Sequence, residues 1–333
     1  MAKPTVSATS RKTIYELGRC PICDGKEASE VADRASILEE FERVWSFHSR
    51  RFRHPVPPKY LTDRVVFSQP PAFSLLSCTG CSHVYRNPRE SAETVRRAYA
   101  EPLPSETVYE ALFENQRRAY RGQIRRLRKF AGRINNGLEV GSYMGGFLAA
   151  ARDAGMSFVG IDVNASAKDF GSRQGLRITT GELEDIPVTE SHDAIAIWST
   201  FEQLPDVRAA ARAARGLLKA GGVLALRVPN VEFYTRWRRR LDGVIAPWAE
   251  RMLAHNNLLG FPYREGFTQR SLERLLADAR LRIEQVHGDT LVPVADRWTR
   301  AAGAIDEHAT KLIQRTIQHG WRAPWIEIYA RGR

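Results

Sequence analysis

The second half of the chain alternates short apolar runs with segments whose apolar residues recur at helical spacing. The runs that read as strands lie at 137–140, 158–162, 192–198, 223–229, 281–287 and 325–331. Several of them are followed by glycine or polar residues, where a turn can begin. This alternation predicts an α/β domain built around one sheet.

Helical patterns also occupy the first third of the chain and its C-terminal part. The apolar residues of 35–48 recur at helical spacing and predict an amphipathic helix, while 105–133 read as one long basic helix. A further helix is expected within 296–319, and Thr268 is expected to cap the start of another. Residues 49–59 are basic and rich in proline, which favours an exposed loop.

A glycine-rich turn follows the first strand of the predicted sheet. It reads Glu139-Val-Gly141-Ser-Tyr-Met-Gly145, and the next strand ends in Asp162. Glycines let backbone amides approach a ligand that a Cβ would push away, and an acid that ends the next strand can accept both hydroxyls of a ribose. The two features predict a nucleotide-cofactor site in one βαβ unit.

Two classes of cofactor use this spacing, and Tyr143 distinguishes them. A dinucleotide fingerprint has Gly-x-Gly-x-x-Gly, with the pyrophosphate on the helix N-terminus, whereas here Tyr143 stands where the middle glycine would be. The pattern Glu139-x-Gly141-x-x-x-Gly145 instead resembles motif I of the class I S-adenosylmethionine (SAM)-dependent methyltransferases. A dehydrogenase and a glycine-rich turn without a ligand are the alternatives.

Later segments resemble the same family in the order that it requires. Gly181-Glu-Leu-Glu-Asp resembles the loop after strand three, and Glu202-Gln203 follows strand four where many small-molecule methyltransferases have Glu-His. Residues 217–230 resemble the passage into strand five. The resemblance covers about residues 134–290 and implies a Rossmann-like seven-stranded sheet with a reversed last hairpin, with SAM as cofactor.

The resemblance also implies roles for individual residues of the cofactor site. Gly141 and Gly145 would form the close turn and Asp162 would hold the ribose. Glu182 and Leu183 would approach the adenine, and Trp198 would border the sulfonium. The full set of expected cofactor-binding residues is Glu139, Gly141, Ser142, Gly145, Asp162, Val163, Glu182, Leu183 and Trp198.

The four cysteines of the chain form two pairs, Cys20-Pro-Ile-Cys23 and Cys78-Thr-Gly-Cys81. Two such knuckles can present four thiolates tetrahedrally to a soft divalent ion, so a structural Zn²⁺ site is expected, with two unrelated thiol pairs as the alternative. His83 is then expected beside the site or at the surface, because the cysteines complete the ligand set. The long interval between the pairs predicts an inserted subdomain.

Cysteine pairs followed by an Asn-Pro segment and a methyltransferase domain resemble the zinc-ribbon-bearing methyltransferases of sugar and secondary metabolism. The predicted organisation is a flexible tail at 1–19, a zinc-binding module with a helical insertion at 20–95 and a helical linker at 96–133. The methyltransferase domain would occupy 134–333, with a lid at 231–266.

The lid is expected to line the acceptor site, because it is the longest insertion after the carboxyl end of a strand. His255 and Tyr263 are the candidates for orienting the acceptor or removing its proton, with lid packing as the alternative. Glu202 lies just past strand four and faces either the acceptor or the protein. Alignment of acceptor, methyl and sulfur lowers the barrier, and a base is needed only when the acceptor loses a proton.

The net charge of +12 attracts polyanions in general. The basic residues fall in separated clusters, however, and no RNA-recognition signature is present. We therefore expect a small-molecule acceptor, a sugar or secondary metabolite, free or carrier-bound. The alternatives are an RNA methyltransferase that holds its substrate with the zinc ribbon and basic helix, and an inactive SAM-binding partner protein, suggested by Tyr143 and Gln203.

No apolar run reaches the roughly 18–20 residues of a membrane-spanning helix. The first residues also lack the apolar segment of a secretory signal. A cytoplasmic protein without a membrane partner is therefore expected. The sequence leaves open the acceptor, the atom methylated, the use of a base, the role of the zinc module and the oligomeric state.

Overall fold

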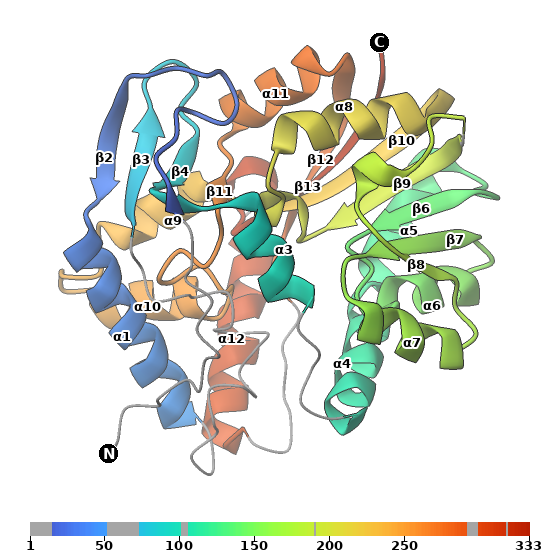
Figure 1. Cartoon of the computed structure of the whole chain (residues 1–333). Coiled ribbons are helices and arrows are strands. Elements are labelled where there is room, and N and C mark those ends of the chain that lie inside the picture. The colour runs from blue at the N-terminus through green and yellow to red at the C-terminus, as the bar shows by residue number, and fades with distance from the viewer. Residues whose placement is uncertain (1–14, 52–72, 101–105, 190, 292–298, 318) are drawn as a thin grey trace.

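Figure 1 shows this computed structural model as a large sheet flanked by helices, with a smaller sheet beside it. The structure describes residues 15–51, 73–100, 106–189, 191–291, 299–317 and 319–333. Residues 1–14 of the expected tail and 52–59 of the expected loop lie outside the described residues. Among the described helices, none has both the length and the apolar character needed to cross a bilayer.

The large sheet contains seven strands in the order β12–β13–β10–β9–β6–β7–β8. Their bounds are β6 Gly137–Val140, β7 Phe158–Asp162, β8 Ile178–Thr180, β9 His192–Trp198, β10 Leu218–Pro229, β12 Leu281–Asp289 and β13 Trp325–Gly332. The strands from β8 to β10 in this order are parallel, whereas β13 is antiparallel to β10 and β12. The predicted Rossmann-like sheet with a reversed last hairpin is confirmed.

Helices cover both faces of this sheet (Figure 1). One face carries α4 Glu106–Ala119, α5 Arg121–Ala131, α6 Gly146–Asp153 and α7 Ala165–Arg173, and the other carries α8 Val207–Leu217 and α11 Gln269–Asp278. Ala194 and Ala196 of β9 pack with the first set of helices, and Ile195 and Ile197 with the second. Because both faces are covered, β9 reads as a continuous apolar run.

The smaller sheet joins two distant parts of the chain. It consists of β2 Ala28–Ala32, β3 Ser74–Cys78 and β4 Val84–Asn87 in an antiparallel ribbon, to which β11 Glu265–Gly266 is added beside β4. The short strands β1 Tyr15–Glu16 and β5 Arg89–Glu90 pair separately, and α3 Ala92–Ala100 follows them. The expected lid therefore ends as an edge strand of the N-terminal module.

A further group of helices packs around a second apolar cluster. It consists of α1 Arg34–Arg51, α9 Val231–Arg238, α10 Ala246–Ala254 and α12 Ala301–Ile317. Ile37, Val44 and Phe47 of α1 share this cluster with Phe233 of α9 and Met252 of α10. The predicted amphipathic helix between the cysteine pairs thus packs on the expected lid, which itself contains two helices.

The long basic helix expected over 105–133 is divided in the structure. Helix α4 ends at Ala119 and α5 begins at Arg121, and the ring of Tyr120 between them packs edge-on against Phe147 at 5.5 Å. Thr268 caps α11 as predicted: its hydroxyl accepts from the Ser271 amide at 3.1 Å, and the Ser271 hydroxyl accepts from the Thr268 amide at 2.9 Å. This reciprocal cap sets the point at which the chain leaves β11 and enters α11.

Candidate functional site

The glycine-rich turn lies at the carboxyl edge of the large sheet. Because β6, β7, β9 and β10 are parallel, the residues that follow them, including Gly141 and Ser199, meet at one edge. Gly141 and Gly145 have φ angles of +70° and +82°, which favour glycine. A Cβ on Gly141 would lie 2.4 Å from the Thr200 side chain, and one on Gly145 would lie 2.6 Å from Leu176. Packing of the turn itself therefore requires both glycines.

Asp162 is held rigidly at the end of β7. One carboxylate oxygen accepts from the backbone amide of Tyr143 at 2.7 Å, and the other accepts from the amide of Asn164 at 2.8 Å. Burial raises the pKa of Asp162, and these two hydrogen bonds oppose the shift. Each oxygen keeps a second lone pair for a ligand hydroxyl. Tyr143 serves the turn through its backbone, at a φ of +46°.

Buried polar atoms without a hydrogen-bond partner gather at this edge. Among the described residues they include side-chain atoms of Glu139, Ser142, Trp198, Ser199 and Glu202. Leaving such a group unsatisfied costs roughly 1–3 kcal/mol, and more for a charge. The arrangement suits an edge whose hydrogen bonds are completed by a ligand.

Glu139 is a buried carboxyl group at this edge. Its side chain is buried, and burial followed by the nearby charge of Asp162 raises the pKa of Glu139 well above its ordinary value. A carboxyl group in this position favours a ligand that brings a positive charge or a hydrogen-bond donor. Ser142 is also buried beside the turn, and its side chain packs against Gly160 of β7.

The loop after β8 is engaged with helix α3. Glu182 accepts from Arg96 at 2.6 and 2.8 Å, and Asn164 donates to the carbonyl of Tyr99 at 3.0 Å. Leu183 begins the 3₁₀ turn η2 Leu183–Asp185 and points into the core, while Glu182 caps that turn. Helix α3 therefore contacts the loops after β7 and β8, a contact that no local sequence pattern reveals.

Val163 and Trp198 occupy different surroundings. Val163, directly after Asp162, is half-buried. Trp198 is buried in the core between the sheet and α6, with its ring 5.5 Å from that of Phe147. Its indole N–H is the part that lacks a partner. The roles expected for both residues stay predictions.

Glu202 lies in the 3₁₀ turn η3 Phe201–Gln203, which follows β9. Its side chain is fully buried, and neither carboxylate oxygen has a hydrogen-bond partner. Burial raises the pKa of Glu202 to about 8, while its own backbone amide and Arg227 oppose the shift. The adjoining Thr200 is the residue that packs against Gly141. The 3₁₀ turn that carries Glu202 thus begins beside the glycine-rich turn.

The structure does not bring the two predicted catalytic residues into one cluster of contacts. Tyr263 is buried, accepts from Asn257 at 3.4 Å and has its pKa raised well above the ordinary value, first by burial and then by the charge of Glu202. It therefore lies within electrostatic reach of Glu202. Its ring packs edge-on against Trp325 at 5.6 Å.

His255 is held among the helices of the second cluster. Arg51 donates to its Nδ1 at 3.1 Å, and its Nε2 donates to Asp306 at 3.0 Å. Burial, followed by the charge of Arg51, lowers the pKa of His255 to about 4. Both ring nitrogens of His255 have partners, so the residue joins α1, α10 and α12 in this packing. A catalytic role for His255 stays a prediction.

The four cysteines meet at the tip of the ribbon. Their sulfur atoms all lie within 4.8 Å of one another, and the pairs Cys20–Cys81 and Cys23–Cys78 are each 3.5 Å apart. Tetrahedral Zn²⁺ with bonds of about 2.3 Å needs sulfurs roughly 3.8 Å apart. The donor set and spacing therefore fit such an ion.

The ribbon is tied to the end of the lid by buried polar contacts. His83 is fully buried and its Nε2 lies 2.7 Å from a carboxylate oxygen of Glu265. Arg86 donates to Glu90 at 2.8 Å and to the carbonyl of Phe261 at 2.9 Å. His83 thus bridges the module to β11, which corrects the alternative of a surface histidine.

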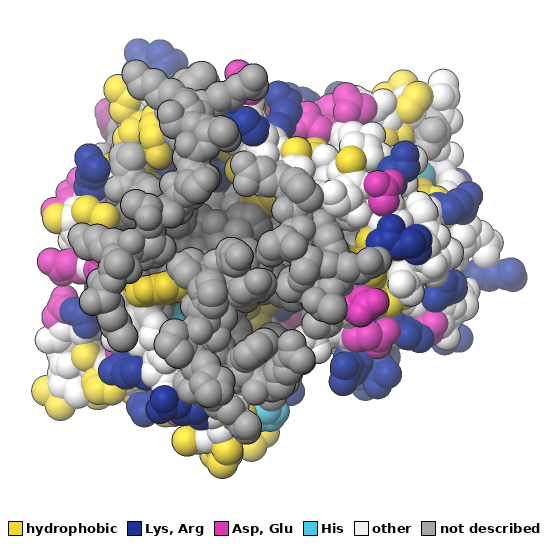
Figure 2. All heavy atoms as spheres, turned by 60° about the horizontal axis from the view of Figure 1, so that its bottom comes forward, with side chains coloured by type: hydrophobic (Ala, Val, Ile, Leu, Met, Phe, Trp, Pro, Cys, Tyr) yellow, Lys and Arg dark blue, Asp and Glu magenta, His cyan; other side chains and the backbone are white. Residues whose placement is uncertain are grey.

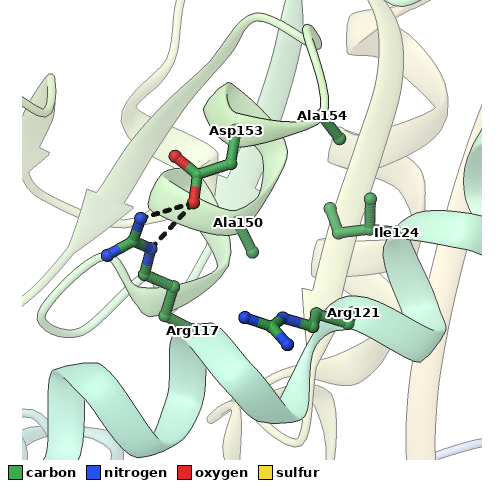
Figure 3. Close-up of a pocket in the computed structure, with 6 residues that line it drawn as sticks. All are labelled: Arg117, Arg121, Ile124, Ala150, Asp153 and Ala154. Carbon is green, nitrogen blue, oxygen red and sulfur yellow. Dashed lines mark hydrogen bonds and ion pairs between the residues drawn. The ribbon is translucent and has the colours of Figure 1, made fainter.

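An open cavity of about 170 Å³ lies elsewhere, between α4–α5 and α6. Figure 3 shows Arg117 turned to Asp153, with a nitrogen–oxygen distance of 2.7 Å, while Arg121 lies on the other side of the cavity. Asp153 is the last residue of α6, whereas the glycine-rich turn precedes the first residue of that helix. The cavity is therefore separate from the edge that carries Asp162 and Glu202.

Comparison with known proteins gives one family match. The model of a family described as methyltransferase domain matches residues 112–286. No curated protein sequence matches the chain.

Two solved structures illustrate the structural similarity. One is a SAM-dependent methyltransferase from Thermotoga maritima, described as a possible histamine N-methyltransferase, with 16% identity and a TM-score of 0.44 over 68% of this chain and 96% of that one. The other is geranyl diphosphate C-methyltransferase from Streptomyces coelicolor A3(2), with 17% identity and a TM-score of 0.44 over 71% of this chain and 88% of that one.

Proposed function

Since this chain belongs to the methyltransferase-domain family, whose model matches more than half of it, we propose that it methylates a small molecule. Membership makes the chain a SAM-dependent methyltransferase. The acceptor, a sugar or secondary metabolite, free or carrier-bound, is the part that we propose. It would bind between the carboxyl edge of the large sheet and the end of the lid.

The observation that carries this placement is the group of unpartnered polar atoms at the carboxyl edge. SAM, when bound, supplies a methyl group on a positively charged sulfur. Asp162 would bind the ribose hydroxyls, and Glu139 would attract the positive part of the cofactor. Gly141, Ser142, Gly145 and Val163 would border it through the turn.

The remaining expected contacts would orient the adenine end and the methyl group. Glu182 and Leu183 would flank the adenine, and the Arg96 ion pair fixes where the Glu182 side chain points. Trp198 would border the sulfonium through its indole edge. Tyr263 would orient the acceptor, because it is buried on the lid within reach of Glu202. His255 would need to leave Arg51 and Asp306 before it could bind an acceptor.

The zinc module would have a structural part in this function. Zn²⁺ on Cys20, Cys23, Cys78 and Cys81 would stabilise the ribbon, and the ribbon carries β11 at the end of the lid. The metal would be remote from the methyl group in this scheme. Its chemistry would be confined to binding the thiolates.

An RNA acceptor is the second candidate, and the exposed arginines of α4 and α5 favour it. Arg121, Arg125 and Arg128 are exposed on α5 at spacings of four and three residues. On the face drawn in Figure 2, however, basic and acidic side chains of the described residues are interspersed around the rim. Binding dominated by phosphate contacts would weaken steeply with salt, which separates this candidate from a small-molecule acceptor.

Calorimetric titration with SAM, S-adenosylhomocysteine (SAH) and NAD tests the cofactor site. We expect micromolar binding of SAM and SAH by the zinc-loaded chain, no binding of NAD, and at least tenfold weaker SAH binding by Asp162→Ala. Glu273→Gln, an exposed change on α11, serves as the control. Absence of SAM and SAH binding to folded protein would overturn the proposal, and binding without turnover on any acceptor would favour an inactive partner protein.

A further inference from the structure

Glu202 differs from the other buried carboxylates of the molecule. Glu40 accepts from Tyr234 and from the amide of Gly260, and Glu265 is hydrogen-bonded to His83. Among the described residues, Glu202 is the carboxylate for which both oxygens are buried without a partner. A fully buried carboxyl group without a partner takes up a proton unless a nearby positive charge favours its ionised form.

The surroundings of Glu202 indicate which ligand could favour its ionised form. The turn η3 begins directly after Thr200, which packs against Gly141 of the cofactor turn. Burial, followed by the charge of Glu202, raises the pKa of Tyr99 on α3 and of Tyr263 on the lid, so both phenols lie within electrostatic reach of Glu202. The turn that carries Glu202 therefore begins beside the glycine-rich turn, and the charge of Glu202 reaches Tyr263 on the proposed acceptor side.

The remaining charged groups near η3 already have partners. Arg227 of β10 lies 3.0 Å from Asp289, and its guanidinium sits over the Trp325 ring at 4.9 Å. Glu265 of the adjoining β11 is bonded to His83, and Asp206 accepts from the first amides of α8. The charge of Arg227 opposes the rise in the pKa of Glu202, but the carboxylate oxygens of Glu202 have no hydrogen-bond partner among the described residues.

From this geometry we infer that Glu202 is a catalytic residue, the base that takes the proton of the acceptor during methyl transfer. The inference rests on the proposed function. An acceptor hydroxyl or acidic carbon forms a bond to the methyl carbon while the carbon–sulfur bond breaks and its electron pair stays on sulfur. The proton passes to the Glu202 carboxylate, so cationic SAM and the carboxylate become neutral SAH and a carboxylic acid. The acid returns its proton to solvent after product release.

The inference narrows the acceptor class, because a base is needed only by an acceptor that must lose a proton. It also couples the base to the cofactor. The positive sulfur of SAM favours the ionised form of a carboxyl group beside it, whereas the neutral sulfur of SAH does not. SAM binding would therefore ionise Glu202 and release a proton before any acceptor is present.

Proton release on cofactor binding tests this without knowledge of the acceptor. The zinc-loaded full chain is titrated with SAM and with SAH at pH 7.5 in phosphate and in Tris, which differ in ionisation enthalpy. With a pKa of about 8, Glu202 is roughly three-quarters protonated at this pH. We expect about half a proton released per SAM and almost none per SAH. Glu202→Gln abolishes the difference, whereas Glu273→Gln on α11 keeps it.

The outcomes separate this inference from the proposed function. If SAM does not bind at all, the cofactor site is wrong. If SAM binds tightly but releases no proton, or if Glu202→Gln releases as much as the natural chain, Glu202 is not the base. Binding of SAH by Glu202→Gln shows that the variant is folded, and Glu202→Asp restores part of the release. Glu139→Gln is the second measurement, because Glu139 is the other buried carboxyl group with a raised pKa at this edge. Proton release that persists in Glu139→Gln supports Glu202, whereas loss of the release in that variant would overturn the inference.

With an identified acceptor, the same variants give the catalytic readout. Loss of a general base lowers turnover by about 10²–10⁴-fold, so Glu202→Gln should fall by at least 10²-fold while its affinity for SAH stays unchanged. Turnover within about threefold of the natural chain would overturn the inference.

Discussion

Two regions of this molecule bury charged side chains, and they differ in how far those side chains are paired. Where the ribbon meets the lid, His83 is bonded to Glu265 and Arg86 to Glu90, and the carboxylate oxygens of Glu265 and Glu90 that lack a hydrogen bond still lie 3.6 and 3.8 Å from an arginine. At the carboxyl edge of the large sheet, buried oxygens of Glu139 and Glu202 have no partner. Paired buried charges hold two segments in one arrangement, whereas unpaired ones indicate a site completed by a ligand. Burial alone therefore does not identify a functional residue.

Metal removal should have the largest effect on the paired region. Stripping Zn²⁺ from the cysteine cluster should remove several kcal/mol from the ribbon, because metal binding and folding of such modules are coupled. Hydrogen exchange should then rise first in 84–87 and 261–266, which are joined through β4 and β11. SAH affinity should stay within about tenfold, since the turn belongs to the other region. Unchanged exchange in 261–266 would show that the ribbon does not support the lid.

Breaking one buried pair should cost less than losing the metal. Arg86→Met removes the donor to Glu90 and to the Phe261 carbonyl and leaves a buried carboxylate, so the free energy of unfolding should fall by about 3–5 kcal/mol. Arg282→Met, which disrupts an exposed pair with Glu284, is the control and should change it by less than about 1 kcal/mol. Equal changes in the free energy of unfolding of the two variants, measured in urea, would show that the buried Arg86–Glu90 pair does not hold the ribbon to the lid.

Removing the unpaired carboxyl group of Glu202 should stabilise the fold at high pH, whereas breaking a buried pair destabilises it. Burial raises the pKa of Glu202 to about 8 in the folded chain, so its protonation stabilises the fold at low pH, and this contribution is lost as pH rises through 8. The natural chain should lose about 3 kcal/mol between pH 5.5 and pH 8.5 that Glu202→Gln does not lose. If the free energies of unfolding of the two proteins, measured in urea, change equally with pH over this range, Glu202 does not belong to the unpaired region.

The smallest effect is expected at the half-exposed pair between α3 and the loop after β8. Arg96→Ala should change the free energy of unfolding by less than about 1 kcal/mol, because the Arg96–Glu182 pair is partly solvated. SAH binding should weaken by a few-fold, since the Glu182 side chain loses its fixed direction. A change in the free energy of unfolding above about 2 kcal/mol would show that the Arg96–Glu182 pair behaves like the buried pairs between ribbon and lid.

The parts of the fold that follow local rules could be predicted from the sequence. The turn at Gly141 and Gly145, the carboxylate at the end of β7 and the Thr268 cap each depend on residues close together in the chain. The strand order required the family resemblance as well. The division at Tyr120 was not predicted, and the ring contact of Tyr120 with Phe147 of a later helix is one that no local pattern contains.

Contacts between distant segments could not be read from local patterns. Strand β11 has two residues, and only the edge of β4 makes it a strand. The partners of His255 on α1 and α12 lie 204 and 51 residues away along the chain. The sequence placed Glu202 after strand four, but the lack of a partner for its carboxylate depends on every element around η3.

A crystal structure of the zinc-loaded chain with SAH would locate the site of methyl transfer. We expect SAH on the Gly141–Gly145 turn, with ribose hydroxyls on Asp162 and the sulfur facing Glu202 on the side of Tyr263. Binding elsewhere, or with the sulfur turned away from Glu202, would show that the unpaired carboxylates do not mark the site of methyl transfer.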